Sequence, residues 1–185
     1  DNFDTEDWIE LINYGETVTD LSNWTFKDDD DEHIYQIPEQ TILSPNGYLI
    51  IARDIDLFLN HHPESGNILG PFDFGLGGGG DQIRIFNDQG ILIDSVEYDD
   101  SEPWPSEPDG LGSTLELINP FYDNSLSESW ASSEDNGSPG AENSSFLEIF
   151  QASTIIPNKT QIMPAYPNPF NGRVVIPFQL SEETN

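Results

Sequence analysis

Short runs in which apolar and polar residues alternate recur along the first 120 residues of the chain. Residues 8–12 read Trp-Ile-Glu-Leu-Ile, and the same period of two returns at residues 83–85 and 115–117. Such a period places the apolar side chains on one face of a strand. Turn signals separate the runs, for example Pro-Asn-Gly at 45–47 and Pro-Asp-Gly at 108–110. The pattern predicts an all-β antiparallel sandwich or barrel of short strands.

Two segments within this pattern favour short helical turns instead. Residues 54–60 and 125–130 each begin with a polar side chain that is able to cap a helix. Of the tryptophans, Trp8 and Trp24 lie on strand patterns, so we expect them in the core. The bulk of Trp130 is expected to close one end of the sandwich.

The balance of charge excludes whole classes of partner. The chain has 35 acidic residues against 5 Lys and Arg, a formal net charge of −30. Nucleic acids and anionic lipid surfaces are bound through Lys and Arg, so neither nucleic acid nor a membrane surface is an expected partner. No apolar run approaches the roughly 20 residues that span a bilayer, so we expect no membrane insertion. Cysteine is absent, which excludes disulfides, thiol nucleophiles and cysteine-bound metals.

The sequence contains little evidence for a catalytic motif. There is no Gly-x-Ser-x-Gly, and the histidines are His33, His61 and His62. The glycine run at 77–80 lacks the Lys and the Ser or Thr of a phosphate-binding loop. Carboxylate pairs are plentiful, but with 35 acidic residues such pairs arise by chance. We therefore expect no catalytic residue in this segment and no enzymatic activity of its own.

An acidic run at residues 28–32 is the candidate metal site. Asp28, Asp30, Asp31 and Glu32 are the candidate ligands for Ca²⁺, because hard divalent cations prefer oxygen ligands and would relieve the repulsion between consecutive carboxylates. The run lacks the spacing of an EF-hand. The alternative is a solvated acidic loop without a cofactor.

Trp104 is the candidate ligand-binding residue. It lies between Pro103 and Pro105, and a segment flanked by prolines cannot join a central strand. We therefore expect an exposed indole, on which a sugar could stack. The alternative is that Trp104 covers the edge of a sheet.

The composition changes near residue 143 and divides the chain. Of the 35 acidic residues, 32 precede Ser144, and Gly, Ser, Pro and Asn are frequent in residues 137–145. We predict a β domain at 1–143, an extended linker at 144–163 and a separate segment at 164–185.

Several motifs of the first segment, in this order, resemble the lamin tail domain family. The resemblance implies an immunoglobulin-like β-sandwich, and family members usually carry a further strand before the one at residues 8–12. We therefore expect the chain to start one strand late, with an unpaired sheet edge. The matching stretches are residues 7–13, 18–26, 43–51, 93–98, 103–105, 113–120, Trp130 and 138–143.

A second resemblance lies near the C-terminus. Tyr166, Pro167, Asn168, Pro169, Phe170 and Asn171 spell Tyr-Pro-Asn-Pro-Phe-Asn, followed by the alternating run 174–180. This is similar to the opening of the type IX secretion C-terminal sorting domain. The resemblance implies a partial β sorting domain at 164–185, with export through the outer membrane of a Bacteroidota-like bacterium to its surface or surroundings. The type IX secretion machinery would then be a partner.

Two functions follow from these expectations. In the first, the segment is a non-catalytic structural or interaction module of a larger exported protein, whose upstream domains are its partners and carry any catalysis. In the second, it is a calcium-dependent adhesin or carbohydrate-binding module, whose partner is a polysaccharide or another surface protein.

Overall fold

The computed structural model describes residues 5–110, 112–146, 161–162 and 178–179. The chain divides into two compact units, residues 1–148 and 149–185. In the second unit, two short strands, β12 (Gln161–Ile162) and β13 (Phe178–Gln179), pair antiparallel. The sorting motif at 166–171 lies outside the described residues.

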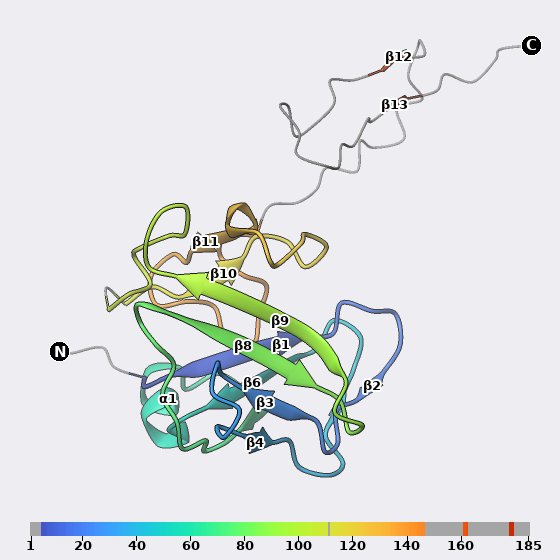
Figure 1. Cartoon of the computed structure of the whole chain (residues 1–185), viewed down its shortest axis with the longest axis vertical. Coiled ribbons are helices and arrows are strands. Elements are labelled where there is room, and N and C mark those ends of the chain that lie inside the picture. The colour runs from blue at the N-terminus through green and yellow to red at the C-terminus, as the bar shows by residue number, and fades with distance from the viewer. Residues whose placement is uncertain (1–4, 111, 147–160, 163–177, 180–185) are drawn as a thin grey trace, which may run out of the picture. The chain divides into compact units, whose positions relative to one another are not determined.

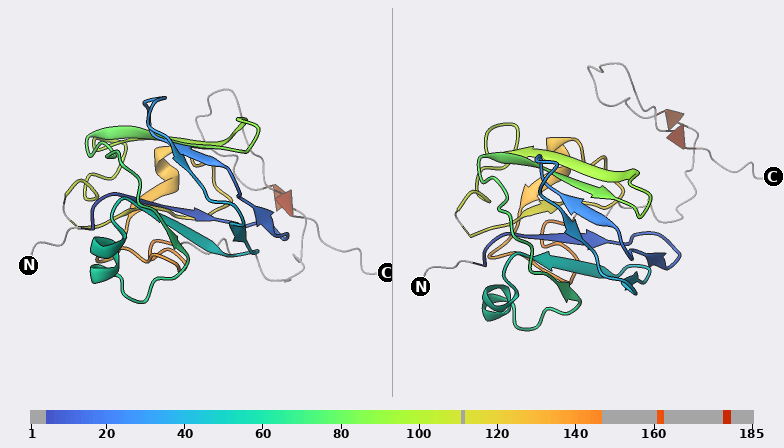
Figure 2. Two further views of the ribbon diagram at one scale, coloured as in Figure 1. Left: turned by 90° about the horizontal axis from the view of Figure 1, so that it is seen from below. Right: turned by 60° about the horizontal axis from the view of Figure 1, so that its bottom comes forward.

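Two sheets form the body of the first unit, as Figures 1 and 2 show in three views. One has the strand order β1-β6-β7 and the other the order β4-β3-β8-β9. All neighbours are antiparallel except β6 and β7, which are parallel. The strands of the first sheet are β1 (Trp8–Ile12), β6 (Tyr48–Ala52) and β7 (Ile68–Leu69). Those of the second are β3 (Thr25–Lys27), β4 (Tyr35–Gln36), β8 (Gly80–Phe86) and β9 (Leu92–Asp99).

Two further two-stranded sheets and two short helices are found in the described part of this unit. The pairs are β2 (Thr19–Asp20) with β5 (Ile42–Leu43), and β10 (Leu115–Leu117) with β11 (Trp130–Ser132). The helices are α1 (Ile55–His61) and the 3₁₀ turn η1 (Ser127–Ser129). Both fall inside the segments predicted to be helical or extend them by one residue. Neither of these described helices is long and apolar enough to cross a membrane.

The turns follow the local chemistry of the sequence. Asn46 adopts a positive φ of 56°, and a Cβ at Gly47 would lie only 2.9 Å from the carbonyl oxygen of Ser44, so this tight turn requires glycine. The side chain of Asn87 accepts hydrogen bonds from the backbone N–H groups of Gln89 and Ile91, which closes the β8–β9 hairpin. Helix α1 begins where Asp54 accepts a hydrogen bond from the N–H of Leu57 at 2.9 Å.

Successive residues of the first sheet point to opposite faces, and both of these faces are apolar. Ile9, Leu49 and Ile51 belong to the larger buried cluster, together with Phe26 and Ile85 from the second sheet. This is the interior of a β-sandwich, and the immunoglobulin-like fold predicted from the sequence is confirmed.

The opposite face of the first sheet is covered by α1. Phe58 of the helix is fully buried against Ile50 and Ala52, and the ring of Trp8 packs edge-on against it with centroids 5.3 Å apart. Trp8 and Trp24 are both half-buried and each packs against a core cluster, as expected.

Candidate functional site

The acidic run after β3 is organised by hydrogen bonds within the protein. Asp28 is only 2% exposed, and its Oδ2 lies 2.7 Å from Nδ1 of His33. Its Oδ1 accepts the N–H of Asp30 at 2.9 Å. The His33 ring stacks on Phe74, with centroids 5.1 Å apart. The hydrogen bond to Asp28 raises the pKa of His33. The carboxylate of Asp28 therefore has two partners that fix the loop.

The other predicted ligands point to different partners. Asp31 accepts from Arg84 at 2.9 Å, and its carboxylate lies 3.8 Å from the ammonium of Lys27. Asp30 accepts the N–H of Glu32 at 2.8 Å, which is a local turn. The structure therefore distributes Asp30, Asp31 and Glu32 around the loop and does not gather them with Asp28.

A different set of carboxylates does converge. In the described part of the chain, ligand oxygens of Asp28, Asp29 and Asp81 lie within 4.8 Å of one another, which is a spacing that could hold a cation. Asp81, at the start of β8, also accepts backbone N–H groups from Gly77 and Gln82, each at 2.7 Å. No sequence pattern pointed to Asp81, because only the pairing of β3 with β8 brings it beside the loop.

Trp104 is half-buried, whereas the sequence predicted an exposed ring. Its ring centroid lies 6.3 Å from that of Trp130. Trp130 in turn donates from Nε1 to the carbonyl oxygen of Asn124 at 2.8 Å. Trp104 also lines a small pocket with Tyr98 and Leu126. One side of the indole therefore packs on the protein.

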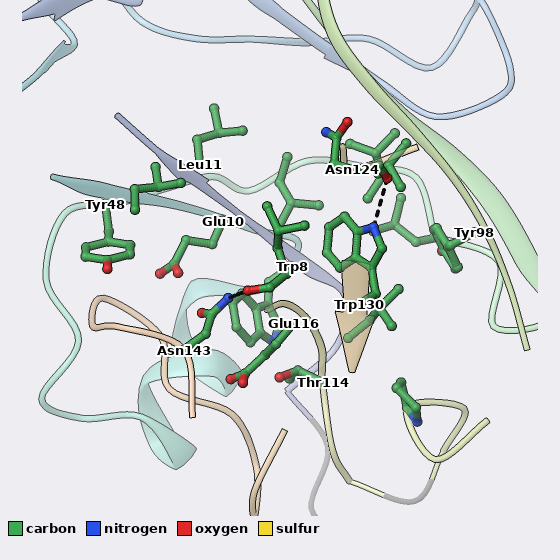
Figure 3. Close-up of a pocket in the computed structure, with 18 of the residues that line it drawn as sticks. Trp8, Glu10, Leu11, Tyr48, Tyr98, Thr114, Glu116, Asn124, Trp130 and Asn143 are labelled. Carbon is green, nitrogen blue, oxygen red and sulfur yellow. Dashed lines mark hydrogen bonds between the residues drawn. The ribbon is translucent and has the colours of Figure 1, made fainter. Parts of the chain in front are cut away.

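A cavity of about 1260 Å³ runs along β1 and β10 in the described part of the chain, and Figure 3 shows residues that line it. Every residue from 5 to 14 lines it, and so does every residue from 112 to 117. On the interior side it is lined by Ile83, Ile85 and Val96 of the second sheet. It is a long groove between two strands rather than a pit, because consecutive residues of both strands line it. We call this cavity the β1–β10 groove.

Two carboxylates lie at the outer side of the β1–β10 groove, on either side of Asn143 in Figure 3. Glu116 of β10 is 5% exposed and accepts the hydroxyls of Ser138 and Ser144, each at 2.8 Å, and the N–H of Ser145 at 2.9 Å. Glu10 of β1 accepts the N–H of Gly140 at 2.6 Å. The segment 138–145 therefore joins the two strands through their carboxylates.

The environment of Glu10 disfavours its negative charge. Burial raises its pKa to about 7, the nearby charge of Glu116 adds to the rise, and the hydrogen bond from Gly140 opposes it. A carboxylic acid that titrates near neutrality is suited to a pH-dependent contact or to proton transfer. However, no histidine, and hence no Ser–His pair, is found among the described residues that line the groove.

In the sequence, Glu10 and Glu116 each stand between apolar residues of an alternating run, and nothing there singles them out. What buries them is segment 138–145, which the sequence suggested to be the start of a linker. Ser144 and Ser145 were assigned to that linker, yet both donate to Glu116. The folded unit therefore extends at least two residues beyond the predicted boundary at 143. The one sequence feature that hinted at this contact is the group of serines at 138, 144 and 145, which supply the donors for Glu116.

A family model described as the Lamin Tail Domain matches residues 1–100. No curated protein matches the chain.

Proposed function

The chain belongs to the lamin tail domain family, since the family model covers more than half of it, and from this premise we propose that it serves as a non-catalytic structural and interaction module of a larger exported protein. The family fold is immunoglobulin-like, which agrees with the two packed sheets. Such a fold presents edges and loops to partners, so function has to be argued from those surfaces.

The arrangement around Glu116 is the observation that carries this proposal. Among described residues, it is the most enclosed carboxylate of the β1–β10 groove, and three donors from segment 138–145 occupy its oxygens. A catalytic carboxylate must keep an oxygen free for substrate or water. Glu116 instead ties one part of the chain to another, which is a structural role.

The sequence motif at 166–171 supports export. Its resemblance to the opening of the type IX sorting domain is independent of the lamin tail match, and it follows the sandwich in the same chain. The high negative charge keeps a protein hydrated and repels anionic polymers, which suits a location outside the cell.

Export is tested in the bacterium that produces the protein. Replacing Tyr166, Pro167 and Phe170 with alanine should move the protein from the surface or the medium to the periplasm, as measured by surface labelling and fractionation. The matched control replaces three residues of the preceding segment, Thr154, Asn158 and Thr160, with alanine and should leave the location unchanged. An unaltered location of the motif variant would contradict the sorting role.

The test of the non-catalytic role is removal of residues 5–146 from the same protein. Any hydrolytic or transferase activity of the parent protein should survive with an unchanged kcat. If kcat were abolished although the remaining domains stay folded by circular dichroism, the module would carry catalytic groups and the proposal would be wrong.

A calcium-dependent binding module is the second candidate, and the convergence of Asp28, Asp29 and Asp81 favours it. The half-buried pair of Trp104 and Trp130 offers one indole face to a sugar. Retention on a polysaccharide panel, with calcium or with a chelator, separates the two candidates. Calcium-dependent retention that is lost in both Asp29→Asn and Trp104→Ala, but kept in the exposed control Asp88→Asn, would support this second function.

A further inference from the structure

A small pocket lies where the end of β9 meets the segment that contains η1. Its volume is about 390 Å³, which falls within the range of about 300–1,000 Å³ found for small-ligand sites. Trp104, residues 97–99 of β9 and residues 125–128 line it. None of these residues belongs to β1 or β10, so its walls do not depend on what pairs with those strands. We call it the Trp104 pocket.

The walls of the Trp104 pocket are held in place by contacts within the protein. The side-chain amide of Asn124 donates to the carboxylate of Asp94 at 2.8 Å, which ties the segment before η1 to β9. Trp130 donates from Nε1 to the carbonyl oxygen of Asn124 at 2.8 Å, and its ring lies against that of Trp104 with centroids 6.3 Å apart. A pocket that is formed before its ligand arrives costs less ordering when the ligand binds.

The charged groups of the Trp104 pocket all have the same sign. Glu97 and Asp99 are two positions apart on β9, so they point to the same face, and Glu128 belongs to the opposite wall. Hydrogen bonds from Ser101 lower the pKa of Asp99 and so favour its charged form. No Lys, Arg or His is found among the described residues that line the pocket. The negative charge of the walls is therefore not compensated within the pocket.

The indole of Trp104 determines which kind of cation suits these carboxylates. The face of an aromatic ring attracts a cation whose charge lies within about 6 Å of the ring centre, and tryptophan does this best. A hard metal ion prefers oxygen ligands and gains little from a ring. An organic cation gains from both, because its carbon atoms pack on the indole while its charge faces the carboxylates. The combination of ring and carboxylates therefore favours an organic cation.

A neutral sugar fits the Trp104 pocket less well. Two of the hydroxyls that line it already donate within the protein, that of Tyr98 to the carbonyl oxygen of Gly77 at 3.0 Å and that of Ser125 to Asp123 at 2.6 Å. The remaining polar groups are mainly carboxylates, which only accept hydrogen bonds when ionised. A sugar hydroxyl both donates and accepts, so the pocket meets its needs only in part.

We propose that the Trp104 pocket binds an organic cation, an alkylammonium or guanidinium group, with its charge against the indole of Trp104 and between the carboxylates of Glu97, Asp99 and Glu128. This rests on the proposed function as an interaction module and specifies the chemistry of its partner. The same group is carried by a basic side chain of another polypeptide and by a small free molecule. The net charge of −30 attracts either one to the surface.

The first probe is choline, titrated into the full 185-residue chain at constant ionic strength and followed by NMR of the indole N–H signals. The Trp104 signal should shift and saturate with a dissociation constant on the order of 1 mM, because one cation on one partly exposed ring gives weak binding. The signals of Trp8 and Trp24, which pack against the core clusters, should not move. The neutral molecule of the same shape, 3,3-dimethyl-1-butanol, should bind about tenfold more weakly.

A second pair of probes distinguishes the two sources of the cation. Blocked tripeptides Gly-Lys-Gly and Gly-Arg-Gly present the basic side chain of a polypeptide, and blocked Gly-Gln-Gly is their neutral control. A tripeptide that binds more tightly than choline would identify a polypeptide partner, and the reverse order would identify a small molecule. Either order supports a cation site at Trp104.

Variants of the protein test the two halves of the pocket. The double variant Glu97→Gln and Glu128→Gln should weaken choline binding about threefold or more. Its matched control, Glu16→Gln with Glu39→Gln, removes the same charge from exposed positions outside the pocket and should leave binding unchanged. Trp104→Leu should weaken binding about fivefold, whereas Trp104→Phe keeps an aromatic face and most of the affinity. Because Glu97 and Glu128 are exposed, their variant tests the site even if Trp104→Leu does not fold.

Three outcomes would overturn the proposal. They are the absence of a saturable shift of Trp104 with any of the cations, equal binding of choline and its neutral analogue, and an equal loss in the two double variants. A neutral sugar that shifts the Trp104 signal where no cation does would assign the pocket to the second candidate function instead. The export and deletion experiments do not involve this pocket, so their outcomes remain separate.

Discussion

Carboxylates are enclosed in two regions of the sandwich, the loop around Asp28 and the β1–β10 groove. The two regions differ in how they compensate the negative charge. Asp28 has His33 and a backbone N–H as partners, and the Arg84 side chain binds its carbonyl at 2.7 Å. Glu10 has one backbone donor and faces another carboxylate, Glu116. In this strongly acidic chain, burial of an acid is therefore no sign of function by itself. The more informative carboxylate is Glu10, because burial and the facing charge of Glu116 raise its pKa.

The largest effect is expected at Glu116. Glu116→Ala leaves the hydroxyls of Ser138 and Ser144 and the N–H of Ser145 without their acceptor, so we expect the free energy of unfolding to fall by about 3 kcal/mol. Urea denaturation measures this, with the exposed Glu39→Ala as control. A loss below about 0.5 kcal/mol would mean that segment 138–145 does not depend on this carboxylate.

Glu10 should give the next largest effect, through pH. Its folded-state pKa of about 7 lies above the ordinary value of 4.5, so the folded state binds the proton more tightly. Its contribution to stability is therefore full below about pH 4.5 and is lost as pH rises through 7. Relative to the wild type, Glu10→Gln should gain roughly 2 kcal/mol between about pH 4.5 and pH 8. A pH-independent difference between the two proteins would contradict the raised pKa.

At Asp28 the expected loss is smaller, because an amide can replace part of what the carboxylate does. Asp28→Asn still accepts from Asp30 but loses the charge that faces His33, so we expect about 1 kcal/mol less stability. The pKa of His33 should fall toward its ordinary value, as followed by NMR, whereas the exposed control Asp88→Asn leaves it unchanged. The interpretation fails if the His33 titration is the same in both variants.

Calcium removal should have the smallest effect. Asp81 already accepts three backbone N–H groups and Asp28 is bonded to His33, so a cation would have to compete with these partners. We expect the melting temperature in a chelator and in millimolar calcium to agree within about 1 °C. A large rise with calcium would instead show that Asp28, Asp29 and Asp81 form a structural metal site, and would favour the second candidate function.

The sequence predicted the fold well because the signals for strands are local. Alternation located β1, β8 and β10, the Pro-Asn-Gly turn preceded β6 as expected, and a polar cap placed the start of α1. The candidate sites depend on contacts that are distant in the sequence. Asp81 reaches the acidic loop only through strand pairing, and its hydrogen bond to Asp29 joins residues 52 positions apart.

The β1–β10 groove could not be derived from local patterns either. Glu10 and Glu116 lie 106 positions apart in the sequence, and the segment that bonds to both has the composition of a linker. Among the described residues, β1 lies at the edge of its sheet. The open edge of β10 on the opposite side of the groove was not foreseen.

Hydrogen exchange of the chain by itself is the most direct test of the β1–β10 groove. The structure predicts an alternating pattern along β1, with slow amides at Ile9 and Leu11, which bond to β6, and fast amides at Trp8, Glu10 and Ile12. Uniformly slow exchange along β1 in the isolated chain would mean that its outer edge is already paired. The assignment of β1 to the edge of its sheet would then be wrong.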